Sequence, residues 1–199
     1  SGKGGTLLLH LGDGGGRLDL VEDILASSDL PRRLFYPTHC NRNPSLLVQA
    51  MEHAKKGGFI DFTVSTTPEL IAAGEVPALE ALRSSIEAGA PRENLTLSSD
   101  AGGSLPNYVD GELKGLAEAR PSALLDLLRE AVSSQDEAPA DVIAALTRNP
   151  AEALQLARKG RIEPGADADL LLLDPIDTQL TDVFCQGRRL MRYGQILTT

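Results

Sequence analysis

The sequence predicts an α/β fold with parallel strands, followed by a small β segment at its C-terminal end. Through about residue 158, short apolar runs bounded by Gly and Pro alternate with stretches whose apolar residues recur every three or four positions. These patterns are typical of buried strands and of helices. From Gly160 onward, short strand-like runs are separated by turn residues instead. We therefore expect two parts, residues 1–158 and 159–199.

The elements of the first part follow in order along the chain. We expect buried strands at Thr6–Leu11, Leu34–Cys40, Phe59–Ser65 and Leu95–Ser99. The helices between them are expected at Leu18–Ala26, Leu46–Lys56 and Ala78–Ala88. After the fourth strand we expect a loop rich in Gly, Asn and Asp, and then helices at Ser122–Ser133, Pro139–Thr147 and Pro150–Ala157.

The second part begins with a turn at Pro164-Gly165, which leads into the strand-like run LLLL. The segment VFCQGRRLMRYGQIL then predicts a hairpin that turns either at Gly187 or at Tyr193-Gly194. Four strand–helix units in the first part are too few to close a barrel of eight, and an open sheet would leave long apolar edges. We therefore expect a partner segment to supply the remaining strands.

Composition excludes several classes of protein. The chain has 199 residues, of which 42% are hydrophobic, and a formal net charge of −9. No run of about 18 apolar residues could span a membrane, and no block of Lys and Arg suggests nucleic acid. Cys40 and Cys185 lack CxxC spacing, so we expect reduced thiols in a cytoplasmic protein. Cys40 is expected to be a buried core thiol.

Three strand-like runs end on a residue that can bind a metal ion, namely His10, His39 and Asp100. The C-terminal ends of parallel barrel strands converge on one mouth, so these side chains can meet there. Two imidazoles and a carboxylate suit zinc or a similar divalent metal. The alternatives are two histidines bonded to their neighbours and an aspartate that caps a turn. His53 lies in a helix, and we expect it on a solvated face.

Several motifs resemble the amidohydrolase superfamily and, within it, are most similar to the isoaspartyl dipeptidases. They are HLGDG (10–14), YPTHCNRNPSLLVQAMEHAKKGG (36–58), IDFT (60–63), LSSDAGGSLP (97–106) and the tail GRIEPGADADLLLLD (160–174). The resemblance implies the C-terminal half of a TIM-like (β/α)8 barrel, strands five to eight, plus a small C-terminal β segment. The family's first-strand His-x-His pair and bridging carbamylated lysine would lie upstream, so this chain would hold ligands mainly for one of two zinc ions.

The resemblance also implies roles for individual residues. His10 and His39 would bind the same metal, and Asp100 would be both a metal ligand and the general acid–base residue. Arg42 would clamp a substrate carboxylate, where the alternative is a surface ion pair. Ser104 would help to hold the substrate's α-amino group, where the alternative is a turn-forming serine. Neighbouring glycines would let the backbone approach the ligand closely.

The function implied is zinc-dependent hydrolysis of the β-aspartyl (isoaspartyl) bond of short peptides by a metal-activated hydroxide, with two zinc ions per complete protomer. The expected partners are a small peptide substrate, the missing N-terminal half-barrel and further copies in a homo-oligomer. Two alternatives stay open. One is another superfamily hydrolase of cyclic amides or acyl-amino acids, such as a dihydroorotase-like enzyme. The other is a non-catalytic fragment or subunit that lacks the N-terminal metal ligands.

Overall fold

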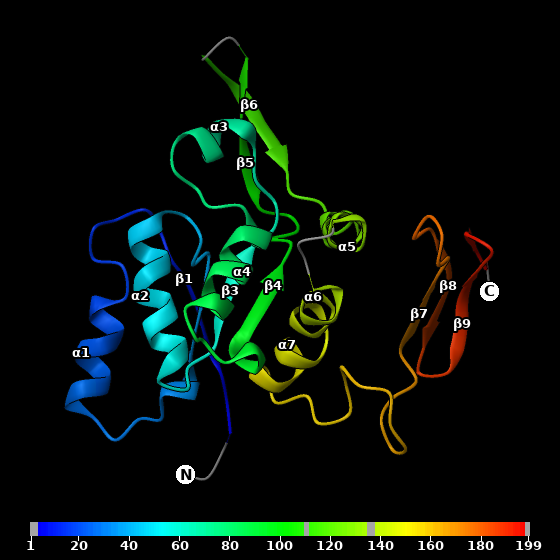
Figure 1. Ribbon diagram of the computed structural model, residues 1–199, viewed down its shortest axis with the longest axis horizontal. Helices are drawn as coiled ribbons and strands as arrows, with labels where there is room; N and C mark the ends of the chain where they lie inside the picture. The colour runs from blue at the N-terminus through cyan, green and yellow to red at the C-terminus, as the bar shows by residue number, and fades with distance from the viewer. Residues whose placement is uncertain (1–3, 110–111, 135–137, 198–199) are drawn as a thin grey trace. The chain divides into compact units, whose positions relative to one another are not determined.

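The computed structural model describes residues 4–109, 112–134 and 138–197 (Figure 1). The remaining residues of the two predicted parts lie outside this description. By its internal contacts the chain divides after Gln155 into two compact units. No helix in the described ranges is long and apolar enough to cross a membrane.

Four parallel strands form the centre of the first unit: β1 (Leu7–His10), β2 (Phe35–Thr38), β3 (Ile60–Thr63) and β4 (Leu95–Ser98). β1 pairs in parallel with β2, and β3 pairs in parallel with β4. β2 lies beside β3, where the backbone N–H of Cys40 donates to the Asp61 carbonyl at 3.0 Å. The four predicted strands are confirmed, and within the described residues they do not close into a barrel.

The expectation that all four strands are buried on both faces is wrong for β1. Every residue of β2 and β3 is buried. In β1, by contrast, Leu7 is 46% exposed and Leu8 is 48% exposed. β1 has β2 as its one strand neighbour among the described residues. A strand at the edge of a sheet can leave apolar side chains in solvent. The apolar pattern of the sequence does not distinguish an edge strand from a central strand.

Helices follow the strands and cover them. They are α1 (Asp19–Ser27), α2 (Pro44–Lys55), α3 (Pro68–Ala72), α4 (Ala78–Glu87), α5 (Ala123–Ser133), α6 (Pro139–Leu146) and α7 (Arg148–Ala153), with short 3-10 turns η1 (Arg32–Leu34) and η2 (Arg92–Asn94). α2 and α4 pack on β3, and α6 and α7 pack on β4 (Figure 1). α2 begins where the Asn43 side chain accepts the Leu46 N–H at 2.9 Å, which is a normal helix cap.

Two predictions for the middle of the chain need correction. The expected loop after Asp100 contains an antiparallel hairpin, β5 (Ser104–Val109) and β6 (Glu112–Glu118). All of β6 is exposed, so the hairpin lacks the buried apolar face that signals a strand in sequence. α7 also ends at Ala153 rather than at Ala157, because Gln155 adopts a left-handed φ of 58° that a helix cannot continue.

His53 was expected on a solvated helix face, and this is wrong: the residue is 1% exposed. His53 follows Leu46 by seven positions, which places both on the same side of α2. Its Nδ1 lies 2.8 Å from Arg32 Nη1 and 3.2 Å from Glu22 Oε1. The pKa of Glu22 is lowered to about 2, chiefly by its hydrogen bond with Arg32. Gly58 covers the ring, since a Cβ there would lie 2.1 Å from His53 Nε2.

The second unit contains one antiparallel sheet in the order β10-β9-β8-β7, with β7 (Leu170–Leu173), β8 (Leu180–Cys185), β9 (Arg188–Arg192) and β10 (Gln195–Ile196). The sequence predicted a turn at one of two places, and the structure has a turn at both. Gln186 and Gly187 have φ of 50° and 79°, and Tyr193 and Gly194 have φ of 48° and 74°. Two consecutive residues with positive φ are typical of the tight turns that join hairpin strands.

Candidate metal centre and substrate pocket

Two of the three predicted metal ligands have an unusual backbone conformation. His39 follows β2 with φ of 65°, and Asp100 follows β4 with φ of 52°. A left-handed φ in a residue other than glycine is uncommon, and such strain of about 1–3 kcal/mol concentrates at functional sites. His39 and Asp100 thus share a left-handed backbone conformation directly after two different strands.

The three predicted ligands come together. One candidate ligand atom from each of His10, His39 and Asp100 lies within 4.8 Å of the others. His10 Nδ1 and His39 Nε2 are 3.0 Å apart. A tetrahedral zinc ion with Zn–N bonds of about 2.0–2.1 Å holds two nitrogens about 3.3 Å apart. Two imidazoles and one carboxylate at this spacing therefore fit a single ion of the zinc type.

The imidazole of His39 is held by its other nitrogen. His39 is 4% exposed, and its Nδ1 lies 2.5 Å from the Thr63 hydroxyl on β3. Burial lowers the pKa of His39, and the positive charge of Arg42 lowers it further. A metal ligand must be a neutral imidazole, and a partner on the far nitrogen fixes its orientation. His39 meets both conditions, with Nε2 directed at His10.

A glycine makes room for the carboxylate of Asp100. A Cβ at Gly103 would lie 2.4 Å from Asp100 Oδ2 and 2.8 Å from the Asp100 carbonyl oxygen. The Gly103 N–H also donates to that carbonyl at 2.8 Å. Any side chain at residue 103 would therefore displace Asp100. Gly102, at φ of 83°, supplies the turn.

A second carboxylate, Asp61 on β3, lies in the interior beneath these residues. Asp61 is 2% exposed and accepts hydrogen bonds from the hydroxyls of Thr38 (2.6 Å), Thr96 (2.8 Å) and Ser98 (2.6 Å). Burial raises the pKa of Asp61, and the three hydroxyls oppose that shift. The network ties β2, β3 and β4 together just below their C-terminal ends. We expected IDFT to form a strand but had assigned no role to Asp61.

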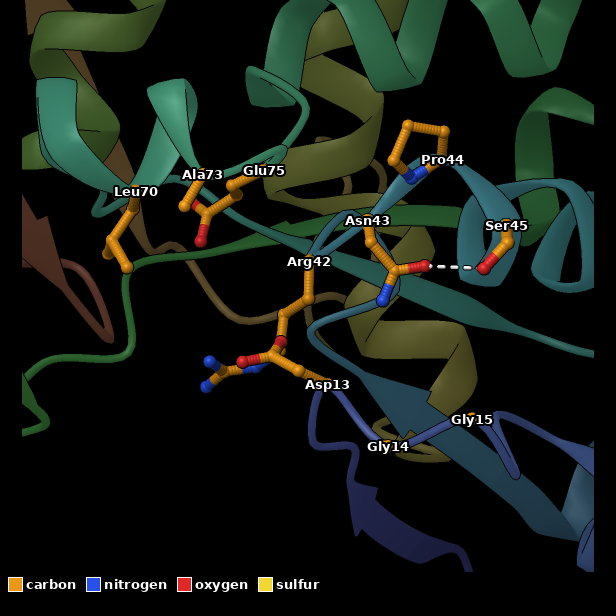
Figure 2. A pocket seen from close by; sticks show the side chains of 10 residues that line it. All are labelled: Asp13, Gly14, Gly15, Arg42, Asn43, Pro44, Ser45, Leu70, Ala73 and Glu75. Carbon is orange, nitrogen blue, oxygen red and sulfur yellow. Dashed lines mark hydrogen bonds between the residues drawn. The ribbon is translucent and has the colours of Figure 1, made fainter.

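Beside the cluster, a cavity of about 560 Å³ opens between three segments of the chain (Figure 2). Its lining comprises Asp13, Gly14, Gly15, Arg42, Asn43, Pro44, Ser45, Leu70, Ala73 and Glu75. Arg42, predicted as a substrate residue, is among them. Ser104 is exposed at the start of β5 and does not line this cavity.

The loop that carries Glu75 is fixed to the loop that carries Arg42. Asn41, which is 1% exposed, accepts the Val76 N–H on its carbonyl at 2.8 Å. The Asn41 side chain donates to the Val76 carbonyl at 2.9 Å and pairs with both backbone groups of Thr63. Arg42 and Glu75 therefore face the cavity from adjoining, clamped segments. No sequence signal pointed to Glu75, because its contacts depend on this non-local pairing.

Cys40, next to His39, is fully buried, and burial raises the pKa of its thiol. The Sγ lies 3.4 Å from the Pro37 carbonyl. The prediction of a packed core thiol is confirmed.

The structure is an α/β fold whose strand ends gather two imidazoles and a carboxylate into a candidate metal site. The Amidohydrolase family model matches residues 36–196, and the chain belongs to that family.

Solved structures extend the similarity over nearly all of the chain. A β-aspartyl dipeptidase from Fervidobacterium islandicum AW-1, in complex with a β-Asp-Leu dipeptide, is 32% identical with a TM-score of 0.84 and covers 98% of this chain. A second structure of a β-aspartyl dipeptidase from the same organism is 29% identical, with a TM-score of 0.81 and 98% coverage. This chain spans 50% and 47% of those chains, about half their length. The predicted resemblance to isoaspartyl dipeptidases is confirmed.

A curated adenine deaminase from Geobacillus kaustophilus (strain HTA426) is 41% identical over 58 residues, which is 29% of this chain and 10% of that protein.

Proposed function

We propose that the protein containing this chain is a zinc-dependent dipeptidase that hydrolyses the β-aspartyl bond of short peptides. The observation that carries the proposal is the cluster of His10, His39 and Asp100 beside Arg42, in a chain 32% identical to a β-aspartyl dipeptidase crystallised with β-Asp-Leu. When bound, zinc supplies a Lewis acid and lowers the pKa of a coordinated water from about 15.7 to about 7.

The chain's own residues bind the metal and the substrate and transfer the proton. His10 Nδ1 and His39 Nε2 would hold the metal, and the Thr63 hydroxyl fixes the orientation of the His39 imidazole. An Asp100 carboxylate oxygen takes the proton of the attacking water and passes it to the leaving amine. Arg42 binds a substrate carboxylate through two parallel hydrogen bonds. Ser104 contacts the amino end of the peptide, which would require the β5–β6 hairpin to lie over the site when substrate is bound.

We further propose that β1 to β4 are strands five to eight of a (β/α)8 barrel and that another segment supplies the others. The half-exposed apolar side chains of β1 support this proposal, as does the span of about half of the matched dipeptidase chains. The further metal ligands and the second zinc would come with that segment. We also propose that the protein is a homo-oligomer in the cytoplasm, where free cysteines such as Cys40 and Cys185 are common.

The decisive test is Asp100→Asn in the full-length protein. The amide keeps the shape of the side chain but cannot accept and return a proton, so we expect kcat to fall by at least about 100-fold. Circular dichroism and the thermal midpoint should stay close to wild type. Near-normal turnover of β-Asp-Leu by this variant would remove Asp100 from the mechanism.

A substrate panel separates the proposed activity from the related alternatives. β-Asp-Leu, α-Asp-Leu and dihydroorotate would be assayed side by side, with zinc content measured by mass spectrometry. Selective hydrolysis of β-Asp-Leu with about two zinc ions per protomer is expected. Preferential turnover of dihydroorotate would favour a cyclic-amide hydrolase. A full-length protein that binds no zinc and hydrolyses none of the three would be a non-catalytic subunit.

A further inference from the structure

The cavity beside the metal cluster has a mixed lining. Asp13, Arg42 and Glu75 contribute two negative charges and one positive charge, and Figure 2 shows their side chains extending into the same region from three different loops. Leu70 and Ala73 add an apolar wall. The volume of about 560 Å³ falls within the range of about 300–1,000 Å³ for small-molecule sites.

Two buried polar atoms at this cavity have no hydrogen-bond partner within the part of the chain that the structure describes. They are Nε of Arg42, a donor, and Oε1 of Glu75, an acceptor. A buried unpaired group costs about 1–3 kcal/mol, and such groups in a folded protein call for an explanation. A ligand that offers an acceptor to Arg42 and a donor to Glu75 would satisfy both.

The backbone next to Glu75 is fixed by hydrogen bonds. Asn41, which precedes Arg42, makes two hydrogen bonds with Val76, which follows Glu75, and these bonds join the two segments. Burial raises the pKa of Glu75, and the negative charge of Asp13 raises it further, whereas Thr66 and Arg42 oppose that shift. A cation arriving in the cavity would meet two carboxylates, so its charge would be compensated there.

We propose that this cavity is the subsite for the residue that follows isoaspartate, and that Glu75 selects a cationic side chain, such as that of lysine, at that place. Arg42 receives the carboxylate of this residue, the apolar wall of Leu70 and Ala73 packs against its methylene groups, and Glu75 accepts hydrogen bonds from its ammonium group. The inference rests on the proposed function, because it assigns the leaving half of a β-aspartyl dipeptide to a defined pocket.

The test uses the zinc-loaded full-length protein and the peptides β-Asp-Lys, β-Asp-Leu and β-Asp-Glu. We expect kcat/KM to decrease in that order, since both Glu75 and Asp13 repel an acidic side chain. In Glu75→Gln the ratio of kcat/KM for β-Asp-Lys over β-Asp-Leu should fall about tenfold, the effect of losing one charge-assisted hydrogen bond. Glu75→Asp keeps the charge and should retain part of the preference.

The matched control is Glu69→Gln, which removes an exposed carboxylate from α3 outside the cavity. This variant should keep the wild-type ratio. A second readout needs no turnover: calorimetric titration with free L-lysine and L-leucine should show tighter binding of lysine to wild type, and Glu75→Gln should abolish the difference.

The outcomes separate the two proposals. Hydrolysis of all three peptides with the same lysine-to-leucine ratio in wild type and in Glu75→Gln would overturn the subsite and leave the dipeptidase assignment standing. Absence of peptide hydrolysis, together with lysine binding that depends on Glu75, would overturn the dipeptidase assignment and with it the subsite, and would leave only a Glu75-dependent lysine-binding cavity. Equal binding of lysine and leucine to wild type would overturn the subsite whatever the activity.

Discussion

The two histidines of the candidate metal centre lie at the C-terminal ends of neighbouring parallel strands, yet their surroundings differ. His39 is buried at the end of a fully buried strand, strained at φ of 65° and anchored to Thr63. His10 is exposed at the end of a half-exposed edge strand. The difference indicates that this chain alone orients His39, whereas the orientation of His10 would depend on the segment that we propose to cover β1.

The largest effect expected from this contrast comes from removing each histidine in turn. His10→Ala and His39→Ala should each reduce zinc affinity and kcat by more than about 100-fold, since loss of an outer partner alone costs up to that much. Only His39→Ala should also destabilise the metal-free protein, by about 2–3 kcal/mol, because it leaves a cavity and an unpaired Thr63 hydroxyl.

Urea unfolding in EDTA measures the second effect, and a zinc chelator competition measures the first. In the 199-residue chain alone, His10→Ala should change the unfolding free energy by less than about 0.5 kcal/mol, as an exposed substitution does. Equal destabilisation by both variants in this chain would contradict the comparison. In the full-length protein, where another segment is proposed to cover β1, His10→Ala is expected to cost more.

A smaller effect is expected from the residue that orients His39. Thr63→Val removes the hydroxyl at Nδ1 while keeping the shape of the side chain, and outer partners of metal ligands typically contribute 10–100-fold in affinity. We expect zinc affinity to fall within about that range with the fold intact. The control is Thr181→Val in the second unit, which should leave affinity unchanged. Wild-type affinity in Thr63→Val would show that His39 needs no anchor.

The smallest effect concerns acid stability. Burial lowers the pKa of both His39 and His53, so between those lowered values and about 6.5 the unfolded chain binds more protons than the folded protein. Stability is therefore fully present above about pH 6.5 and is lost as pH falls below it. Each histidine can add up to about 1.4 kcal/mol per pH unit to the slope.

Urea titrations in EDTA between pH 7.5 and 5.5 should show a shallower slope for His53→Gln than for wild type, and the remaining slope would report on His39. An unchanged slope in His53→Gln would mean that His53 is protonated to the same extent in the folded and unfolded states. The zinc-loaded protein should be compared as well. Metal binding requires a neutral His39, so its unfolding free energy should fall more steeply with decreasing pH than that of the metal-free protein.

Much of the fold could be predicted from periodicity. The parallel strands, the main helices and both turns of the C-terminal sheet carry local signals, either apolar runs between Gly and Pro or paired turn residues. The β5–β6 hairpin was missed because β6 has no buried face. The burial of His53 was missed because a polar residue is not expected among the apolar residues on the buried side of α2. Its spacing of seven positions from Leu46 nevertheless indicated that side.

The sequence by itself determined which chemical groups stand at the strand ends, and so the kind of ion they suit. His10, His39 and Asp100 each follow an apolar run, and a parallel arrangement of strands brings such ends to one edge. Only the tertiary structure decided the orientation of His39 by Thr63 and the room that Gly103 leaves for Asp100. It also decided that Arg42 and Glu75 line one cavity. Those contacts join residues far apart in the chain, and their geometry arises from packing, which has no local signature in the sequence.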